Sequence, residues 1–107
     1  MAISKKIIII STLDTKGEET RFVKKLIEGR GHLPFVIDCG IKGEPSFQPF
    51  TSRQAVAEAA KTTLDEIIAK ADKNDAIRTM TLGTTEIAKN WNQLSDKVTL
   101  NDSYIPR

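Results

Sequence analysis

Two short apolar runs with an amphipathic segment between them open the chain. The first, Ile7 to Ile10, is β-branched and does not alternate, which predicts a strand covered on both faces of a parallel sheet. The segment that follows has apolar residues at helical spacing, namely Phe22, Val23, Leu26 and Ile27. The second run, Leu33 to Ile37, predicts another strand. Strand, helix and strand in this order are typical of a right-handed βαβ unit.

Three further helices are predicted in the second half of the chain. Thr51 or Ser52 caps a short Ala-rich helix, and Thr63 opens another through a capping-box pattern. A longer helix is expected from about Asp75 to Leu94, with one side formed by residues at steps of three and four: Ile77, Met80, Thr84, Ile87, Trp91 and Leu94. This side is expected to pack on the sheet or, if uncovered, to form a homodimer interface.

These elements predict an α/β fold, a partial Rossmann-like (doubly wound) domain with a short parallel sheet of two or three strands and about four helices. A third strand is a weaker expectation at Val98 to Leu100. The 107 residues are 39% hydrophobic and 28% charged, which limits the chain to one core. We expect a single subdomain over residues 1–107, either part or a short relative of a larger two-subdomain module, because the sheet is incomplete.

Composition and charge exclude several classes of partner. The net charge of +2 comes from 16 basic and 14 acidic residues that are interspersed, so no basic surface for nucleic acid is expected. The longest apolar run is too short to cross a membrane, and the N-terminus lacks an export-signal pattern. A cytoplasmic location is therefore expected. The single cysteine, Cys39, excludes an internal disulfide, and the adjacent Asp38 is expected to raise its pKa.

Polar residues follow both predicted strands, at Ser11 to Gly17 and at Asp38 to Gly40. Parallel sheets bind ligands beyond the carboxyl ends of their strands, so these loops predict a nucleotide site. Asp38 is expected to accept a ribose hydroxyl and Lys16 to contact a phosphate. A hydrated Mg²⁺ at Asp14 is the less favoured alternative, because one carboxylate is a poor metal site without a nucleotide to complete it. The candidate nucleotide-binding residues are Thr12, Asp14, Thr15, Lys16, Gly17, Asp38 and Gly40.

Other interpretations of the first loop stay open. Thr15 and Glu18 also form a capping-box pattern, which would occupy the Thr15 hydroxyl at the helix start. The loop has one glycine where phosphate-binding motifs have several, and Glu18 with Glu19 repels an anion there. A ligand's sugar, base or metal-bound part therefore suits Asp14 better than a bare phosphate.

Four further features carry weaker functional interpretations. Gly40 to Phe50 predicts a long irregular connection and is a candidate functional loop. Arg53 is expected to be a solvated surface residue, with a phosphate contact as the alternative. His32 lies in a turn without nearby Cys or His, so a metal site there is not expected. Trp91 is expected to fill the core.

A longer stretch carries a family resemblance: STLDTKGEETRFVKKLIEGRGHLPFVIDCGIKGEP, in which T-x-D-T-K-G-E-E is the most specific string. It resembles the start of the ATP-binding domain of the tomato mosaic resistance protein family, and the similarity extends over about residues 5 to 98 through Thr51 to Val56 and Asp75 to Ile87. The resemblance implies a dimeric, Rossmann-like ATP-binding module. The chain departs from that family at Val98 to Ser103, where the family has a phosphate-binding glycine-rich stretch.

Two functions follow as hypotheses. The first is a nucleotide-binding module with ATP and possible Mg²⁺ as ligands. The second is a homo-oligomerisation or protein-interaction module that has lost the glycine-rich loop and pairs with a second copy or a missing second subdomain. An ATP hydrolase has less support, because the sequence shows no general base apart from Asp14 and no poised nucleophile, so binding is favoured over catalysis.

Overall fold

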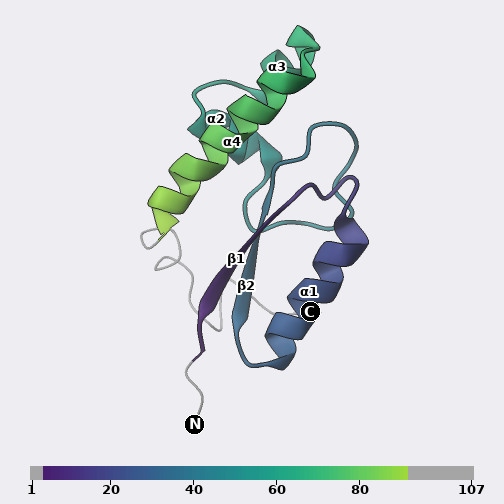
Figure 1. Cartoon of the computed structure of the whole chain (residues 1–107), viewed down its shortest axis with the longest axis vertical. Helices are drawn as coiled ribbons and strands as arrows, with labels where there is room; N and C mark the ends of the chain where they lie inside the picture. Colours follow the sequence, from purple (N-terminus) through teal and green to yellow (C-terminus); the bar gives the residue numbers. More distant parts are fainter. Residues whose placement is uncertain (1–3, 92–107) are drawn as a thin grey trace.

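A computed structural model of the chain describes residues 4–91. The expected strand at Val98 to Leu100 and the last part of the expected long helix lie outside these residues. The elements that the structure describes are β1 (Lys6–Ser11), α1 (Gly17–Gly29), β2 (Leu33–Asp38), α2 (Arg53–Ala59), α3 (Leu64–Lys70) and α4 (Lys73–Lys89) (Figure 1). The predicted α/β class and the partial Rossmann-like arrangement are confirmed.

The sheet consists of β1 and β2, which run parallel from the pair Lys6 and Leu33 to the pair Ser11 and Asp38. The outer edge of β2 is partly occupied by Thr51, whose N–H donates to the Val36 carbonyl (3.1 Å) and whose carbonyl accepts from the Asp38 N–H (3.0 Å). The other edge of β1 pairs with no strand in residues 4–91.

Burial differs sharply between the two strands. Phe35, Val36 and Ile37 of β2 are almost fully buried, as expected for a strand covered on both faces. The isoleucines of β1 are only half-buried, and Ile10 is 52% exposed. The prediction of two covered faces therefore holds for β2 and is wrong for β1, because β1 lies at an open edge of the described sheet.

The core lies between the strands and the group formed by α2, α3 and α4, whereas α1 lies on the other side of the strands (Figure 1). It contains one β2 residue and six helical residues: Ile37, Val56, Ala57, Ile67, Ala76, Met80 and Ile87. Helices α2 and α4 cross closely at Gly83, where a Cβ would lie 2.0 Å from the Val56 carbonyl oxygen. Trp91 stacks edge-to-face on Phe35 with ring centroids 5.0 Å apart, which agrees with its expected packing role.

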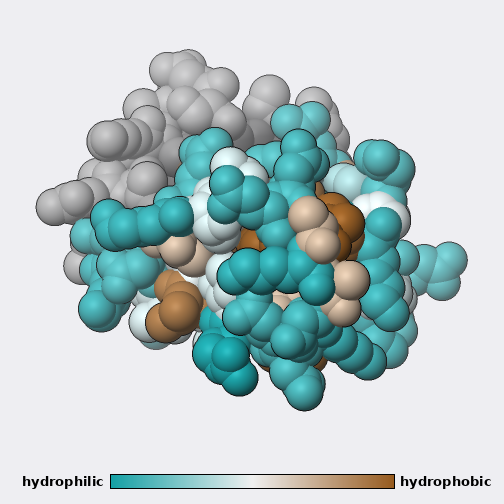
Figure 2. Space-filling view, turned by 90° about the horizontal axis from the view of Figure 1, so that it is seen from above, coloured by the Kyte–Doolittle hydropathy of each residue, from teal (hydrophilic) through white to brown (hydrophobic). Residues whose placement is uncertain are grey.

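The apolar side of α1 does not pack as its spacing predicts. Phe22, Val23 and Leu26 are 65%, 42% and 49% exposed, and the buried residues of this helix are Gly17 and Thr20. Two strands form a surface too narrow to cover the whole apolar side of a helix. On the face seen in Figure 2, in contrast, hydrophobic side chains form only small separate areas within a largely hydrophilic surface.

Side-chain caps explain where the later helices begin. The Ser52 hydroxyl accepts from the Ala55 N–H at 3.1 Å, and the Thr63 hydroxyl accepts from the Glu66 N–H at 3.2 Å, which confirms both predicted starts. Helix α4 begins slightly before the expected position, because Asp72 acts as its cap. No helix in the described part of the chain is long and apolar enough to span a membrane, and the expected cytoplasmic location stays a prediction.

Candidate ligand site at the strand ends

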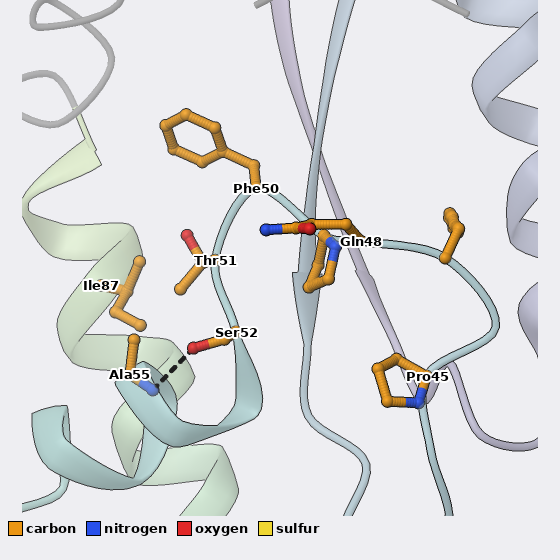
Figure 3. Close-up of a pocket in the computed structure, with 9 residues that line it drawn as sticks. Pro45, Gln48, Phe50, Thr51, Ser52, Ala55 and Ile87 are labelled. Atoms are coloured by element: carbon orange, nitrogen blue, oxygen red, sulfur yellow. Dashed lines mark hydrogen bonds between the residues drawn. The ribbon is translucent and has the colours of Figure 1, made fainter. Parts of the chain in front are cut away.

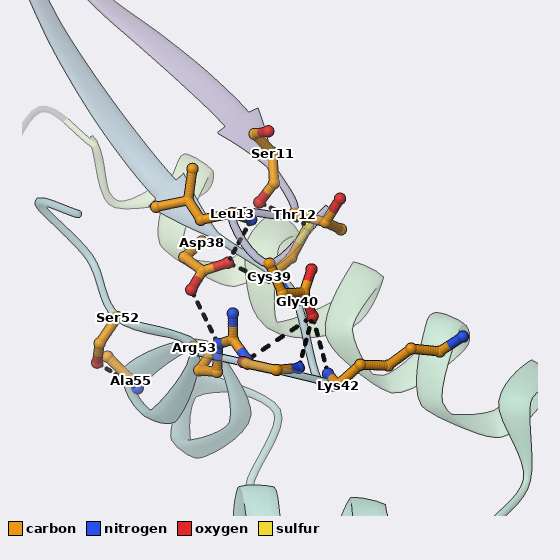
Figure 4. Close-up of polar contacts among 12 residues, drawn as sticks. Ser11, Thr12, Leu13, Asp38, Cys39, Gly40, Lys42, Ser52, Arg53 and Ala55 are labelled. Carbon is orange, nitrogen blue, oxygen red and sulfur yellow. Dashed lines mark hydrogen bonds and ion pairs between the residues drawn. The ribbon is translucent and has the colours of Figure 1, made fainter. Parts of the chain in front are cut away.

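Asp38 ties the ends of the two strands together from inside the protein. Its side chain is almost fully buried; Oδ1 accepts from the N–H groups of Leu13 (3.1 Å) and Gly40 (3.0 Å), and Oδ2 accepts from Arg53 Nε at 2.9 Å (Figure 4). A carboxylate so enclosed and so partnered fixes the backbone on either side of it. Asp38 therefore has a structural role: it is buried and does not lie at the surface where a ribose would bind.

Arg53 is buried, with 5% of the residue exposed, so the expectation of a solvated surface residue is wrong. Its Nε pairs with Asp38, while Nη1 donates to the Gly43 carbonyl and lies 3.8 Å from Asp14 Oδ2. Burying two carboxylates at neighbouring strand ends is unfavourable unless a positive charge lies nearby, and Arg53 supplies that charge. Arg53 Nη2 is buried without a hydrogen-bond partner in residues 4–91.

Asp14 holds the loop that follows β2. Its Oδ2 accepts from the N–H groups of Lys42 (2.9 Å) and Gly43 (3.2 Å). Burial alone would raise the pKa of Asp14, but these two hydrogen bonds and the charge of Arg53 together hold it below the ordinary value of 3.8. A Cβ at Gly40 would lie 2.8 Å from Asp14 Oδ1 and 2.9 Å from Arg53 Nη2, so the glycine permits both side chains to approach this closely.

The lowered pKa of Asp14 predicts a stability change at acidic pH. A carboxylate whose pKa is depressed on folding stabilises the fold above its ordinary pKa of 3.8, and this contribution is lost as the pH falls through the folded value. The stability difference between the wild type and Asp14→Asn should therefore narrow from about pH 5 to about pH 2. Urea unfolding across that range measures it, and a constant difference would contradict the assignment.

The start of α1 differs from the capping-box interpretation. The N-cap is Lys16, without a side-chain hydrogen bond, and the Thr15 hydroxyl instead pairs with the Thr12 hydroxyl at 2.9 Å. Lys16 points to solvent beside Glu19, 3.8 Å away. Gly17 is buried against Ser46, whose Cβ would lie 2.6 Å from a Cβ at residue 17, so this glycine permits a close loop contact.

A cavity of 210 Å³ lies between the strand-end loops and the first turns of α4. Four predicted site residues line it, namely Thr12, Asp14, Thr15 and Gly40, whereas Lys16, Gly17 and Asp38 do not. The other lining residues are Cys39, Ile41, Lys42, Lys73, Ala76, Ile77 and Met80. An adjoining cavity of 380 Å³ shares four of these residues and continues along α4 to Thr81, Thr84 and Thr85.

Sequence reasoning missed the α4 contribution to this site, and it named the Gly40 to Phe50 loop as a candidate without identifying Ile41 or Lys42 in it. The signal in α4 was present, since Ile77 and Met80 belong to its apolar side, but nothing local shows that this side faces the strand ends. Lys73 precedes the expected helix start, and Lys42 lies in a loop of undefined path. Only the tertiary arrangement brings these residues to Asp14.

A larger cavity of 760 Å³ lies elsewhere, where the loop before α2 faces α4 (Figure 3). Residues of this loop face Ala55 and Ile87 across it. Its lining contains no charged residue and none of the predicted site residues: Pro45, Phe47, Gln48, Pro49, Phe50, Thr51, Ser52, Ala55 and Ile87. An uncharged lining suits the phosphates of a nucleotide less well than the cavity at the strand ends.

The remaining candidate residues have structural partners. Burial raises the pKa of the Cys39 thiol and the Asp38 carboxylate raises it further, which confirms the predicted direction and keeps the group a thiol at neutral pH. His32 Nδ1 accepts from the Lys5 N–H at 3.0 Å. Within residues 4–91, no three His, Cys, Asp or Glu side chains come close enough together to hold a metal ion.

Comparisons with known proteins place the chain among relatives. Residues 5–99 match the sequence profile described as "Uncharacterised protein family (UPF0261) N-terminal domain". A UPF0261 protein of Clostridium tetani is 41% identical over 86 residues, covering 80% of this chain and 21% of that protein. A UPF0261 protein of Brucella suis is 39% identical over 90 residues, covering 84% and 22%. No solved structure matches the chain.

The chain thus spans about a fifth of the length of the curated relatives that it matches. The resemblance to the tomato mosaic resistance protein family is overturned, because the matching profile and the curated relatives all carry the UPF0261 description and none points to that family. The string T-x-D-T-K-G-E-E lies within the matched residues, but the family inferred from it was wrong. The profile covers nearly the whole chain, and we conclude that this protein belongs to the UPF0261 family.

Proposed function

We propose that the chain is a nucleotide-binding module whose ligand lies in the cavity between the strand ends and α4. The observation that carries this proposal is the lining of the cavity: hydroxyl and carboxylate groups on one wall, apolar side chains on the other and two lysines. A small cavity with an apolar wall and a few convergent polar groups is typical of small-molecule sites. Its place beyond the carboxyl ends of parallel strands is where open α/β sheets bind ligands.

The polar wall suits the sugar of a nucleotide. Asp14 lines the cavity; its Oδ2 is already engaged by two backbone N–H groups, while Oδ1 lies close to Gly40 and has no hydrogen bond to another residue within residues 4–91. Because the pKa of Asp14 is lowered, its carboxylate is ionised at neutral pH and is a strong acceptor for a hydroxyl. In this proposal Asp14 takes the ribose role that the sequence assigned to Asp38. Thr12 and Thr15 provide further hydroxyl groups in the same wall.

The apolar wall and the lysines suit the other two parts of a nucleotide. Ile41, Ile77 and Met80 provide an apolar surface for the flat base. Lys42 and Lys73 line the same cavity and supply positive charge for phosphates, with ATP and Mg²⁺ as the ligand to test first. In Figure 4 the side chain of Lys42 extends away from the carboxylate cluster, which leaves its charge available to an anion.

Calorimetric titration with ATP and Mg²⁺ tests the proposal. The wild type should bind, and Lys73→Glu should weaken the affinity about 10-fold to 100-fold, because a charge-assisted contact to phosphate is lost and replaced by repulsion. Lys25→Glu is the matched control: Lys25 is exposed on α1 and outside the cavity, so the same charge change should leave the affinity within about 2-fold.

Three outcomes would contradict nucleotide binding at this site. The first is no heat with ATP, ADP or adenosine for the wild type. The second is equal weakening by Lys73→Glu and Lys25→Glu, since only the general charge of the protein would then matter. The third is binding that is insensitive to both changes, which would move the ligand elsewhere, for example to the larger uncharged cavity.

A further inference from the structure

Three threonines of α4 line the 380 Å³ cavity that adjoins the strand ends, here called the threonine cavity: Thr81, Thr84 and Thr85. Ile77 and Met80 line both this cavity and the 210 Å³ cavity, so the two meet at these side chains. None of the residues that line the threonine cavity, all within residues 4–91, is charged, whereas the 210 Å³ cavity has a carboxylate and two lysines. Together the cavities have a charged end and an uncharged end, as a nucleotide does.

Each of the three threonine hydroxyls donates its proton to the helix itself. The acceptors are the carbonyl oxygens four residues earlier: Ile77 for Thr81 (2.7 Å), Met80 for Thr84 (2.8 Å) and Thr81 for Thr85 (2.8 Å). A hydroxyl that has donated its one proton keeps oxygen lone pairs and can then only accept a further hydrogen bond. The threonines therefore present acceptors to the cavity.

The other polar groups around the threonine cavity add little donor capacity. The Cys39 thiol, which its raised pKa keeps protonated, donates to the Ser11 carbonyl with Sγ 3.4 Å from the oxygen. The Thr12 hydroxyl pairs with the Thr15 hydroxyl, and it lies where the two cavities meet. The main-chain N–H groups of α4 along this wall are used within the helix. The α4 wall of the cavity is therefore a wall of acceptors.

A flat base that packs on Ile77 and Met80 directs its edge toward these threonines, a placement that rests on the proposed function. We propose that the threonine cavity selects a base that presents an amino group and rejects one that presents a carbonyl in its place. An amino group donates to the hydroxyl oxygens, whereas a carbonyl oxygen faces their lone pairs and loses the hydrogen bonds that it makes in water. Thr81 and Thr85, one helical turn apart on the same face of α4, are the specificity-determining residues.

Calorimetric titration of the 107-residue chain with ATP and with ITP, each with Mg²⁺, tests this selection. The two ligands share the ribose and the phosphates, but ITP has a carbonyl beside a protonated ring nitrogen where ATP has its amino group. ATP should bind about 10-fold more tightly, because only its base donates to the threonine oxygens at that position. Purine riboside triphosphate, which has a hydrogen atom there, should bind with intermediate affinity. Lys73→Glu should weaken ATP and ITP by the same factor, because their phosphates are identical.

Paired substitutions on α4 show whether the threonines make the distinction. Thr81→Val combined with Thr85→Val replaces both hydroxyls by methyl groups, so ATP should bind more weakly and its advantage over ITP should fall below about 3-fold. Thr81→Ser combined with Thr85→Ser keeps both oxygens and should keep most of the advantage. Thr79→Val is the matched control: Thr79 lies in the same helix but lines neither cavity, so the ratio of the two affinities should not change.

The possible results separate this inference from the proposed function. No heat with any of the three ligands would overturn both. Equal affinities for ATP and ITP would overturn the selection and leave nucleotide binding in place. Tighter binding of ITP would show that the threonines act as donors. An unchanged preference for ATP in the double valine variant, with an unchanged melting temperature, would assign the distinction to other residues and overturn the role given to Thr81 and Thr85.

Discussion

Replacing Arg53 by methionine is expected to lower the free energy of unfolding by about 3–5 kcal/mol, the usual cost of removing one member of a buried ion pair. Asp38 is buried and would lose the 2.9 Å contact from Arg53 Nε. The Gly43 carbonyl would lose its donor as well. Urea unfolding followed by circular dichroism measures the change, and a loss below about 1 kcal/mol would contradict the role given to Arg53.

A double substitution provides the control for this prediction. Asp38→Asn removes the buried charge but keeps a polar side chain of the same size. In the Arg53→Met background it should therefore cost less than in the wild type, or even restore stability, because no unpaired charge remains. Additive effects of the two substitutions would show that the residues do not act as a pair.

Replacing Gly83 by alanine is expected to destabilise the protein although alanine is the better helix former. A Cβ at this position would lie 2.0 Å from the Val56 carbonyl oxygen and 2.9 Å from the Val56 carbonyl carbon, so α2 and α4 would have to separate. Forcing extra volume into a packed contact costs about 1–3 kcal/mol, which exceeds the gain of roughly 1 kcal/mol in helix propensity. Thermal melting should show a clear decrease of the midpoint.

Gly29→Ala is the matched control for the helix crossing. Gly29 is also helical, at the end of α1, but a Cβ there would meet nothing within 4 Å. The same substitution should therefore be neutral or slightly stabilising. If Gly83→Ala were also neutral, the close approach of α2 and α4 would not be a constraint on stability.

Local patterns in the sequence predict the elements well. The βαβ unit follows from two apolar runs and a helical period, and the starts of α2 and α3 follow from Ser52 and Thr63. Each of these signals depends on residues only a few positions apart, which interact in the same way in most folds. The two strand-end loops were located for the same reason, and the structure brings Asp14 and Gly40 together as expected.

The errors concern contacts between distant segments. Arg53 is buried because it meets Asp38, 15 positions away, and Asp14 beyond that, a relation that no local pattern contains. Thr15 matched a capping box but bonds to Thr12, because the turn before α1 brings the two hydroxyls together. The contribution of Lys73 and Met80 to the cavity likewise depends on how α4 lies across the strand ends.

The asymmetry of the sheet also limits how copies of the chain can assemble. Thr51 occupies part of the β2 side, so within residues 4–91 the β1 side is the one that pairs with no strand. Linear polymers that grow by edge pairing need two such edges on every unit. If two copies met through β1, the symmetric contact would consume both edges and growth would stop. Self-association through this sheet should therefore give closed pairs and no fibres.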